Sequence, residues 1–301
     1  MSEPGHQSQK PLEELNACTQ SDFVAVLANI FEYSPWVAEQ AFAARPFAGV
    51  NELFAAMTSA VERAPEDLRL KLIKSHPDLG DKTQRAAGLT VESTAEQTSA
   101  GLDRLSDAEY EAFERVNNAY RAKFGFPYIV CVRRHTKDSI LRDFERRLPN
   151  DAATETKTSI AEICRIAALR LDQLIVAGDR LPVHGRLSTH VLDTHSGKPA
   201  AGIAVELVER SLLGASRVVT TAVTNSDGRT DQPLIGGRPV PIGRYELNFR
   251  VGDYFRARNV PLSDPPFLDD ISLRFAVSDP EGHLHVPLLV TPWSYATYRG
   301  S

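Results

Sequence analysis

Cysteine is scarce in this sequence, with only three among 301 residues. Cys18, Cys131 and Cys164 form no CxxC motif, and an odd number of cysteines cannot all pair in disulfides. Cys131 and Cys164 lie in apolar stretches. We therefore expect buried free thiols and a reducing, cytoplasmic location.

Long apolar runs are also missing. The longest candidate, residues 124–132, falls far short of the roughly 18 residues that a membrane-spanning helix needs. The polar start of the sequence, MSEPGHQSQKPLEEL, lacks the apolar core of a signal peptide. We therefore expect neither a signal peptide nor a membrane partner.

Basic charge is not in excess. Lys and Arg total 34 against 39 Asp and Glu, which gives a net charge of −5, and neither half of the chain is basic. Binding to nucleic acid depends on basic residues that displace counterions from the phosphates. We therefore expect no nucleic-acid partner.

The apolar content is sufficient for two ordinary domains. Hydrophobic residues make up 42% of the chain and charged residues 24%, as in soluble globular proteins. Gly and Pro become more frequent after residue 178, which separates a helical pattern from a pattern of strands and turns. We predict one domain over residues 1–178 and a second over residues 183–301.

The apolar spacing predicts the fold class of each domain. In the first, helices are expected at residues 51–61, 65–75, 107–124, 137–148 and 158–177, after two shorter ones that begin near Ser21 and Ser34. In the second, alternating segments predict strands at residues 184–192, 203–209, 218–224, 243–249, 271–277 and 283–290. An all-α domain followed by an all-β sandwich is the expected architecture.

Two polar positions in the first half are open to two interpretations. His76 ends a helix in SHPDLGD because Pro77 disfavours helical backbone before it. It is either a surface helix end or an imidazole whose cationic form the helix dipole favours, as in a proton donor. Glu96 stands in Ser93-x-x-Glu96-Gln97, the pattern of a capping box that starts a helix, so a structural role is the plainer interpretation.

Arg170 and the run FGFPYIVCV are also ambiguous. On its expected helix, Arg170 shares the apolar face of Ile163 and Leu174, where a guanidinium needs an anion from the protein or from a substrate. In FGFPYIVCV, Pro127 breaks any helix. The extended backbone there is either simply buried or offers its amide and carbonyl groups to a ligand.

Together, HPDLG, SxxEQ, FGFPYIVCV and the helix ExxRIAxLRL resemble the 2-oxo-4-hydroxy-4-carboxy-5-ureidoimidazoline decarboxylases over about residues 15–177. The resemblance implies an all-helical, cofactor-free enzyme of urate degradation. His76 would be the acid or base, Glu96 its carboxylate partner, and Arg170 the group that holds the substrate's negative charge. Other residues implied to line the site are Pro77, Ser93, Gln97 and the backbone of Tyr128, Ile129, Val130, Cys131 and Val132.

Three histidines are the first candidate site residues in the second half of the chain. His283 and His285 share a strand face in GHLHVPLLV, and His190 lies in LSTHVLD. Three such residues could bind zinc, but no carboxylate or cysteine stands at a recognisable metal spacing nearby, so we expect no metal. Arg229 closes the turn NSDGR, where an exposed Arg is ordinary. The ending TPWSYATYRGS is rich in aromatic residues, so we expect it to be packed rather than frayed.

The segments LSTHVLDTHSGKPA, TNSDGR and HLHVPLLVTPWSYATYRGS resemble the 5-hydroxyisourate hydrolases, the transthyretin-related enzymes, over nearly all of residues 183–301. The ending YRGS favours these enzymes over the thyroid-hormone carriers that share their fold. His283 need not be catalytic. The residues that fall on the functional motifs of that family are His190, Arg229, His285, Tyr298 and Ser301.

The two resemblances imply consecutive reactions on purine-derived substrates, without a cofactor. The C-terminal domain would hydrolyse 5-hydroxyisourate, and the N-terminal domain would decarboxylate the product to (S)-allantoin. A homo-oligomer is also implied, with tetramer contacts through the strand domain and dimer contacts through the helical domain. The alternatives are a transthyretin-like carrier with a helical docking domain, and a zinc-dependent hydrolase that uses His190, His283 and His285.

Overall fold

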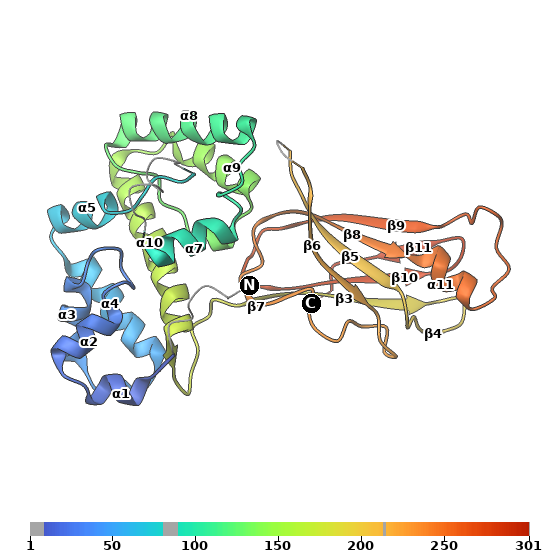
Figure 1. Ribbon diagram of the computed structural model, residues 1–301, viewed down its shortest axis with the longest axis horizontal. Coiled ribbons are helices and arrows are strands. Elements are labelled where there is room, and N and C mark those ends of the chain that lie inside the picture. The colour runs from blue at the N-terminus through green and yellow to red at the C-terminus, as the bar shows by residue number, and fades with distance from the viewer. Residues whose placement is uncertain (1–8, 81–89, 213–214, 301) are drawn as a thin grey trace. The chain divides into compact units, whose positions relative to one another are not determined.

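The structure is a computed structural model that describes residues 9–80, 90–212 and 215–300. The chain separates into two compact units (Figure 1). The first comprises residues 1–133 and 140–183, and the second residues 134–139 and 184–301.

The first unit is built mainly from helices. One exception is the parallel pairing of two short strands, β1 (Lys10–Pro11) and β2 (Ile175–Val176). The segment Val132–Arg134 forms a short 3-10 helix. The α-helices are α1 (Leu12–Ala17), α2 (Gln20–Leu27), α3 (Trp36–Ala41), α4 (Val50–Arg63), α5 (Glu66–Lys74), α7 (Val91–Ser99), α8 (Asp107–Phe124), α9 (Lys137–Arg147) and α10 (Ala152–Leu174). The first three residues of α9 belong to the second unit.

Local sequence sets where the long helices begin and end. Ser106 and Glu109 form a reciprocal capping box at the start of α8, and Gly125, with φ of 72°, ends that helix. The helix expected at residues 107–124 is thus confirmed at both ends. Helix α10 begins at residue 152 rather than 158, because the Asp151 side chain accepts a hydrogen bond from the amide of Thr154 at 2.7 Å.

Helix α10 runs through the core of the first unit. Its residues Ile163, Ala167 and Leu171 are at most 1% exposed and belong to one apolar cluster with side chains from the other helices. Glu155, Glu162 and Arg170 are buried on the same helix. Buried charges are stable only when they are paired and hydrogen-bonded, so each of these positions requires a partner.

The second unit contains two sheets. In one, the strand order is β11-β10-β3-β4, with β7 paired to β3, and in the other it is β6-β5-β8-β9. The elements are β3 (Gly185–Asp193), β4 (Lys198–Pro199), β5 (Ala204–Arg210), β6 (Arg217–Val223), β7 (Ile235–Arg238), β8 (Gly243–Arg250), α11 (Val251–Ala257), β9 (Asp270–Val277), β10 (His283–Val290) and β11 (Tyr295–Thr297).

Alternating side chains from the two sheets form the core of this unit. Leu187 and Val191 of β3 pack in one cluster with Val205 of β5 and with Leu247 and Phe249 of β8. The six predicted strands are confirmed to within one residue at each end. Helix α11 and strands β4, β7 and β11 were not predicted.

Strands β3 and β10 pair in parallel, although they come from opposite ends of the unit. In this register His190 lies opposite Pro287, and Ser188 lies opposite His285. The pairing therefore brings the motifs LSTHVLD and HLHVPLLV side by side. This placement positions the histidines described below.

All three cysteines are free thiols. Cys131 is buried as expected, whereas Cys18 and Cys164 are half-buried. The expectation of burial is wrong for Cys164, which lies on a partly covered face of α10.

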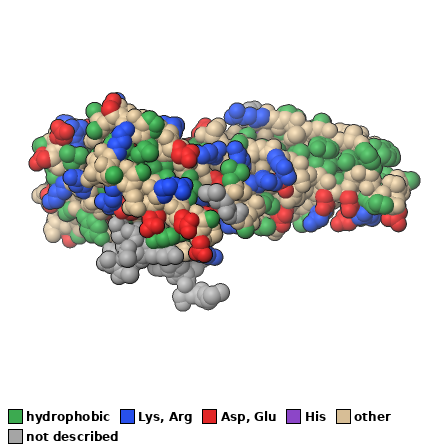
Figure 2. Space-filling model, turned by 90° about the horizontal axis from the view of Figure 1, so that it is seen from above, with side chains coloured by type: hydrophobic (Ala, Val, Ile, Leu, Met, Phe, Trp, Pro, Cys, Tyr) green, Lys and Arg blue, Asp and Glu red, His purple; other side chains and the backbone are tan. Residues whose placement is uncertain are grey.

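Two surface properties complete the description. Among the described residues, no helix has both the length and the apolar composition needed to cross a membrane. On the face shown in Figure 2, Lys and Arg side chains are interspersed with Asp and Glu, in keeping with the small net charge of the chain.

Candidate functional site

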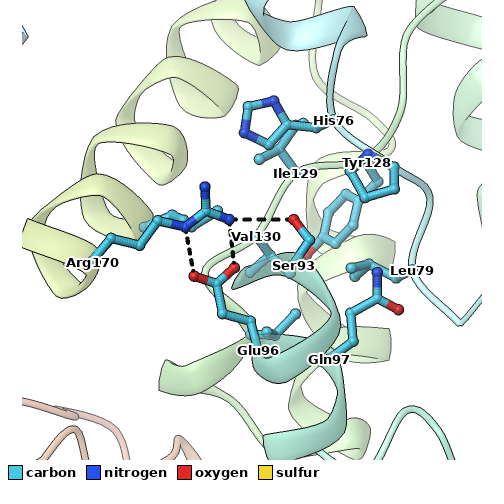
Figure 3. A pocket seen from close by; sticks show the side chains of 12 residues that line it. His76, Leu79, Ser93, Glu96, Gln97, Tyr128, Ile129, Val130 and Arg170 are labelled. Atoms are coloured by element: carbon cyan, nitrogen blue, oxygen red, sulfur yellow. Dashed lines mark hydrogen bonds and ion pairs between the residues drawn. The ribbon is translucent and has the colours of Figure 1, made fainter. Parts of the chain in front are cut away.

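The first unit contains a pocket with an empty volume of about 370 Å³ (Figure 3). Of the residues that the sequence suggested for a site in this unit, Cys131 is the one that does not line the pocket, and Leu79 and Ile166 were not anticipated. The lining residues are His76, Pro77, Leu79, Ser93, Glu96, Gln97, Tyr128, Ile129, Val130, Val132, Ile166 and Arg170.

Helix α7 presents three polar side chains to this pocket. Ser93, Glu96 and Gln97 are spaced three and four residues apart and so share one face of the helix. Thr90 is the N-cap, and its hydroxyl accepts a hydrogen bond from the Ser93 amide at 3.2 Å. The capping-box interpretation is therefore wrong: α7 begins before Ser93, whose hydroxyl instead bonds to Glu32 at 3.0 Å.

Arg170 approaches the same point from α10, with its guanidinium enclosed by acceptors. Its Nε and Nη2 bind the two Glu96 oxygens at 2.8 and 2.9 Å, as Figure 3 shows. Nη1 donates to the Asn29 carbonyl and to Glu32, at 2.9 and 2.8 Å, and Nη2 also donates to Ser93 at 3.3 Å. Protein carboxylates therefore supply the anion that the buried guanidinium requires.

Glu32, in the segment between α2 and α3, was not predicted. It is 1% exposed and accepts hydrogen bonds from Thr90 at 2.7 Å, Ser93 and Arg170. Burial by itself would raise the pKa of Glu32, but Arg170 and the Thr90 hydrogen bond outweigh it and lower that pKa. The only sequence signal for this residue was indirect, namely the need of Arg170 for an acid.

His76 is a neutral imidazole in this pocket. Its Nδ1 lies 3.0 Å from the Leu72 carbonyl oxygen, which can only accept, so Nδ1 carries the proton and Nε2 is left with its lone pair. Burial lowers the pKa of His76 to about 4, although the charge of Glu32 opposes that shift. Both interpretations drawn from the sequence are therefore wrong: His76 is 7% exposed rather than a surface helix end, and burial lowers its pKa instead of leaving the cation favoured.

Buried charged side chains form hydrogen bonds with the backbone of residues 128–132. The Ile129 carbonyl accepts from Arg147, which is fully buried, at 2.7 Å, and the Cys131 amide donates to Glu162 at 2.9 Å. Arg147 in turn bonds to Glu155 of α10. These bonds fix one wall of the pocket.

A second group of polar side chains lies in the sandwich unit. The rings of His190 on β3 and His285 on β10 have centroids 6.5 Å apart. Arg229 pairs with His190 across an isolated bridge, and Gly300 pairs with His285 in the same way. Gly228, with φ of 72°, allows the NSDGR turn to approach β3, because a Cβ there would lie 2.3 Å from the Val191 carbonyl oxygen.

Both imidazoles of this group favour the neutral form. Burial and then Arg229 lower the pKa of His190, and Nε2 of His190 is buried without a hydrogen-bond partner within the described part of the chain. Burial lowers the pKa of His285 as well, followed by Arg229, His190 and His283. Within the same described ranges, no three His, Cys, Asp or Glu side chains are grouped so that they could hold a metal ion.

The C-terminal segment is paired through its backbone, but its large side chains face outward. Strand β11 pairs with β10, so the end is not frayed, but the expectation that its aromatic residues are packed is wrong. Trp293, Tyr295 and Tyr298 are 57%, 48% and 60% exposed. Ser301, the remaining candidate from the sequence, lies outside the described residues.

Comparison with known proteins assigns both units to families. The family model described as OHCU decarboxylase matches residues 16–172, more than half of the chain. The chain belongs to the OHCU decarboxylase family. A second model, described as the HIUase/transthyretin family, matches residues 187–300.

Individual relatives of each unit are enzymes by name. The 2-oxo-4-hydroxy-4-carboxy-5-ureidoimidazoline decarboxylase of Haloferax volcanii is 44% identical over 160 residues, which are 53% of this chain and 93% of the relative. The 5-hydroxyisourate hydrolase of Deinococcus radiodurans is 59% identical over 119 residues, 39% of this chain and 98% of the relative.

One solved structure is similar to the chain through both units. It is a crystal structure of (S)-allantoin synthase, with 34% sequence identity and a TM-score of 0.50. The match covers 97% of this chain and 100% of the other. The OHCU decarboxylase unit and the transthyretin-like unit therefore occur together in a known protein, in the same order.

In this OHCU decarboxylase family member, the structure adds residues that the motifs did not reveal. Glu32 and Thr90 support the decarboxylase-family pocket, and Ser188 lies between His283 and His285 in the transthyretin-like unit, with Oγ 3.1 Å and 2.9 Å from their ring nitrogens. A lone Glu, Thr or Ser has no distinguishing spacing in the sequence. Only tertiary contacts identify them.

Proposed function

We propose that this chain is a bifunctional enzyme of urate degradation. The transthyretin-like unit hydrolyses 5-hydroxyisourate to 2-oxo-4-hydroxy-4-carboxy-5-ureidoimidazoline, and the helical unit decarboxylates that product to (S)-allantoin. The observation that carries the proposal is the presence in one chain of two separate groups built around neutral imidazoles. The similarity of almost the whole chain to (S)-allantoin synthase supports it.

For the hydrolysis, His285 and His190 are the proposed bases. Their lowered pKa values keep the rings neutral at physiological pH, so that one of them can take a proton from water as the water oxygen attacks the cyclic amide. Arg229 would neutralise the negative charge that develops on the purine oxygens. Tyr298 would contact the substrate and Ser301 would complete the site.

For the decarboxylation, His76 is the proposed acid and base. Its Nε2 lone pair would accept the proton of the substrate's 4-hydroxyl group. After CO2 leaves, the imidazolium would return that proton to the carbon, and the ring nitrogen that took up the electron pair would take a second proton from water. No cofactor is invoked, because an adjacent imine-like ring of the substrate can take up the electron pair.

Glu96 would orient the ureido and ring nitrogens of the substrate within this pocket. Pro77, Ser93, Gln97 and the backbone of residues 128–132 would form the remaining walls. Arg170 donates every N–H to the protein, so its proposed role is to hold Glu96 in place, and it could bind the substrate anion only by exchanging one of those bonds.

The wider organisation of the protein is also part of the proposal. Residues 1–178 would form the mainly helical decarboxylase domain and residues 183–301 the mainly β hydrolase domain. Exposed Val218 and Val223 on β6, together with exposed Trp293, Tyr295 and Tyr298 in and around β11, support a homo-oligomer, with tetramer contacts through the sandwich and dimer contacts through the helical unit. The three free thiols support a cytoplasmic location.

The test generates 5-hydroxyisourate in place with urate oxidase and follows ultraviolet absorbance and circular dichroism after the protein is added. We expect rapid loss of the hydroxyisourate band and a growing dichroism signal from (S)-allantoin. Loss of the band without dichroism would leave only the hydrolase. If neither step is accelerated, the proposal is wrong and a transthyretin-like carrier becomes the better explanation.

The variant His76→Asn separates the two sites. Asn retains a donor for the Leu72 carbonyl but has no equivalent of Nε2. We expect the dichroism signal to be lost while hydroxyisourate disappears at the wild-type rate. A parallel fall of both activities would contradict two independent sites.

A further inference from the structure

Ser188 connects two histidines of the sandwich unit. Its Oγ lies 2.9 Å from Nδ1 of His285 and 3.1 Å from Nε2 of His283. Ser188 is 7% exposed on β3 and lies directly opposite His285 in the parallel pairing with β10. The three side chains therefore form a continuous hydrogen-bonded chain.

Because Ser188 has a single hydroxyl hydrogen, it can donate to only one of the two histidines and must accept from the other. The hydrogen bonds therefore have two possible orders of donors and acceptors. In one, His285 Nδ1–H donates to Ser188 and Ser188 donates to His283 Nε2, which leaves Nε2 of His285 free to accept a proton. In the other, His283 donates to Ser188 and Ser188 donates to Nδ1 of His285, which places the His285 proton on Nε2. Only the first order is compatible with His285 as a base.

A positive charge is poorly accommodated at His285. The charged or titratable groups that face its ring are Arg229 from the turn after β6, Arg186 and His190 from β3, and His283 from β10, and burial acts in the same direction. His283, at the start of β10, is exposed to water. A proton that leaves His285 through Ser188 therefore reaches a side chain that is open to water.

We propose that Ser188 and His283 form a proton relay behind His285, which transfers to His283, at the surface, the positive charge that the proton of the attacking water brings to His285. The relay rests on the hydrolase function proposed above. As the water oxygen bonds to the amide carbon, its O–H bond breaks and the proton goes to His285 Nε2. The Nδ1 proton of His285 passes to Ser188, and the Ser188 proton passes to His283 Nε2.

The proton balance of this step is complete. His285 ends neutral with its proton on Nε2, Ser188 is restored, and the positive charge resides on His283 while the negative charge resides on the tetrahedral oxyanion. When the ring opens, the leaving nitrogen takes the Nε2 proton of His285, and the relay runs backwards. Ser188 and His283 are therefore positioning and relay residues that do not touch the substrate.

The test measures hydrolysis rates for His283→Gln, Ser188→Ala and the double variant in the full chain, with a chelator present. His195→Gln is the matched control, because His195 is also exposed in the sandwich unit but lies outside the relay. We expect kcat to fall roughly 10- to 100-fold in both single variants, with KM little changed, a loss that reaches at most the lower end of what acid–base assistance contributes. The kcat of the double variant should be no lower than that of the single variants, because each change already interrupts the same hydrogen-bonded relay.

Two further measurements distinguish a relay from a structural contact. Added imidazole should restore the rate of His283→Ala, since the position is open to water, and should leave Ser188→Ala unchanged. Ser188→Thr, which retains the hydroxyl, should keep most of the activity. An unfolding midpoint of the sandwich unit that matches wild type, followed by circular dichroism, confirms that this unit is folded in each variant.

The possible failures are distinguishable. Wild-type rates in His283→Gln, or additive losses in the double variant, would overturn the relay while leaving the hydrolase function intact. A wild-type protein that does not accelerate the loss of 5-hydroxyisourate would overturn the proposed function, and the relay with it.

Discussion

The negative charge around Arg170 exceeds the positive charge of its own guanidinium. Glu32 and Glu96 lie on either side of its guanidinium, so the group of three has a net charge of −1. Removing one partner of a buried ion pair leaves an unpaired charge, whereas the intact arrangement restricts each side chain to one geometry. The chemical consequence is a fixed position for the Glu96 carboxylate at the edge of the pocket.

Replacing Arg170 with Lys should therefore impair decarboxylation. Lys cannot form the two parallel bonds that now hold both Glu96 oxygens. We expect kcat/KM for allantoin formation to fall roughly 100-fold, the loss associated with misplacing a positioning group, while hydrolysis is unchanged. Arg165→Lys is the control, because Arg165 lies on the same helix but pairs with Glu162 at a half-exposed position. Equal rates in the two variants would contradict the positioning role.

His76 should make the stability of the first unit depend on pH. Its pKa is lowered to about 4 in the folded protein from 6.5, so between these values the unfolded chain binds more protons than the folded one. Stability from this residue is therefore present above pH 6.5 and is lost as the pH falls toward 4, by at most about 1.4 kcal/mol per pH unit. The lowered pKa of Glu32 acts in the same direction but only below 4.5.

Denaturant unfolding at pH 7 and pH 5 tests this dependence. The stability of wild type relative to His76→Asn should decrease over that interval, because Asn does not titrate. A constant difference between the two proteins would show that the imidazole is not held in its neutral form.

At the scale of elements, the sequence patterns located most helices and strands but not their partners. Helix α8 and the six long strands followed from capping residues and alternation, which are local properties. The start of α7 was wrong because Thr90 and Ser93 are both adequate caps, and only the bonds of Ser93 to Glu32 and Arg170 decide between them. The parallel pairing of β3 with β10 depends on the whole sandwich, so no local pattern could predict it.

The same distinction between local sequence patterns and tertiary contacts applies to the candidate site residues. Ten of the lining residues of the pocket were identified in advance, because they lie in motifs with recognisable spacing. The sequence did not identify Glu32, because its role comes from its bond to Arg170, which lies on a helix far away in the sequence. The sequence did not identify Ser188 for the same reason, since its role comes from its hydrogen bonds to the histidines of β10.

Helix α7 offers a prediction at this scale, with a control inside the same unit. Thr90 caps α7 through the Ser93 amide and donates to Glu32 at 2.7 Å, and Thr19 caps α2 through the Asp22 amide and donates to Asp22 at 2.7 Å. Thr90→Ala and Thr19→Ala should each lower the free energy of unfolding by about 1 kcal/mol. Only Thr90→Ala should reduce decarboxylation, because only α7 carries Ser93, Glu96 and Gln97.

Unfolding midpoints and allantoin dichroism are measured for both variants, and Thr90→Ser should restore the wild-type values. If Thr19→Ala reduced decarboxylation as strongly, the effect would be a general loss of stability rather than a displacement of α7.

At the scale of the whole molecule, one chain joins two sites that would act in succession on an intermediate that also decays without catalysis. A tether raises the effective concentration of the second site around the first, to about the millimolar range for short flexible links. Tethering is therefore expected to matter most when the protein is dilute, since the intermediate then has the longest path to a second molecule.

Mixing two single-site variants separates tethering from catalysis. His76→Asn retains the hydrolase and His285→Gln retains the decarboxylase, so an equimolar mixture has each activity on a different chain. We expect the mixture to form (S)-allantoin, because the intermediate can diffuse, but with a smaller dichroism signal than wild type at low protein concentration. The two signals should converge as the concentration rises, since diffusion between chains then outpaces decay. A mixture that matches wild type at every concentration would mean that joining the units contributes nothing to the yield. A mixture that forms no allantoin at any concentration would mean that the decarboxylase accepts its substrate only from its own chain.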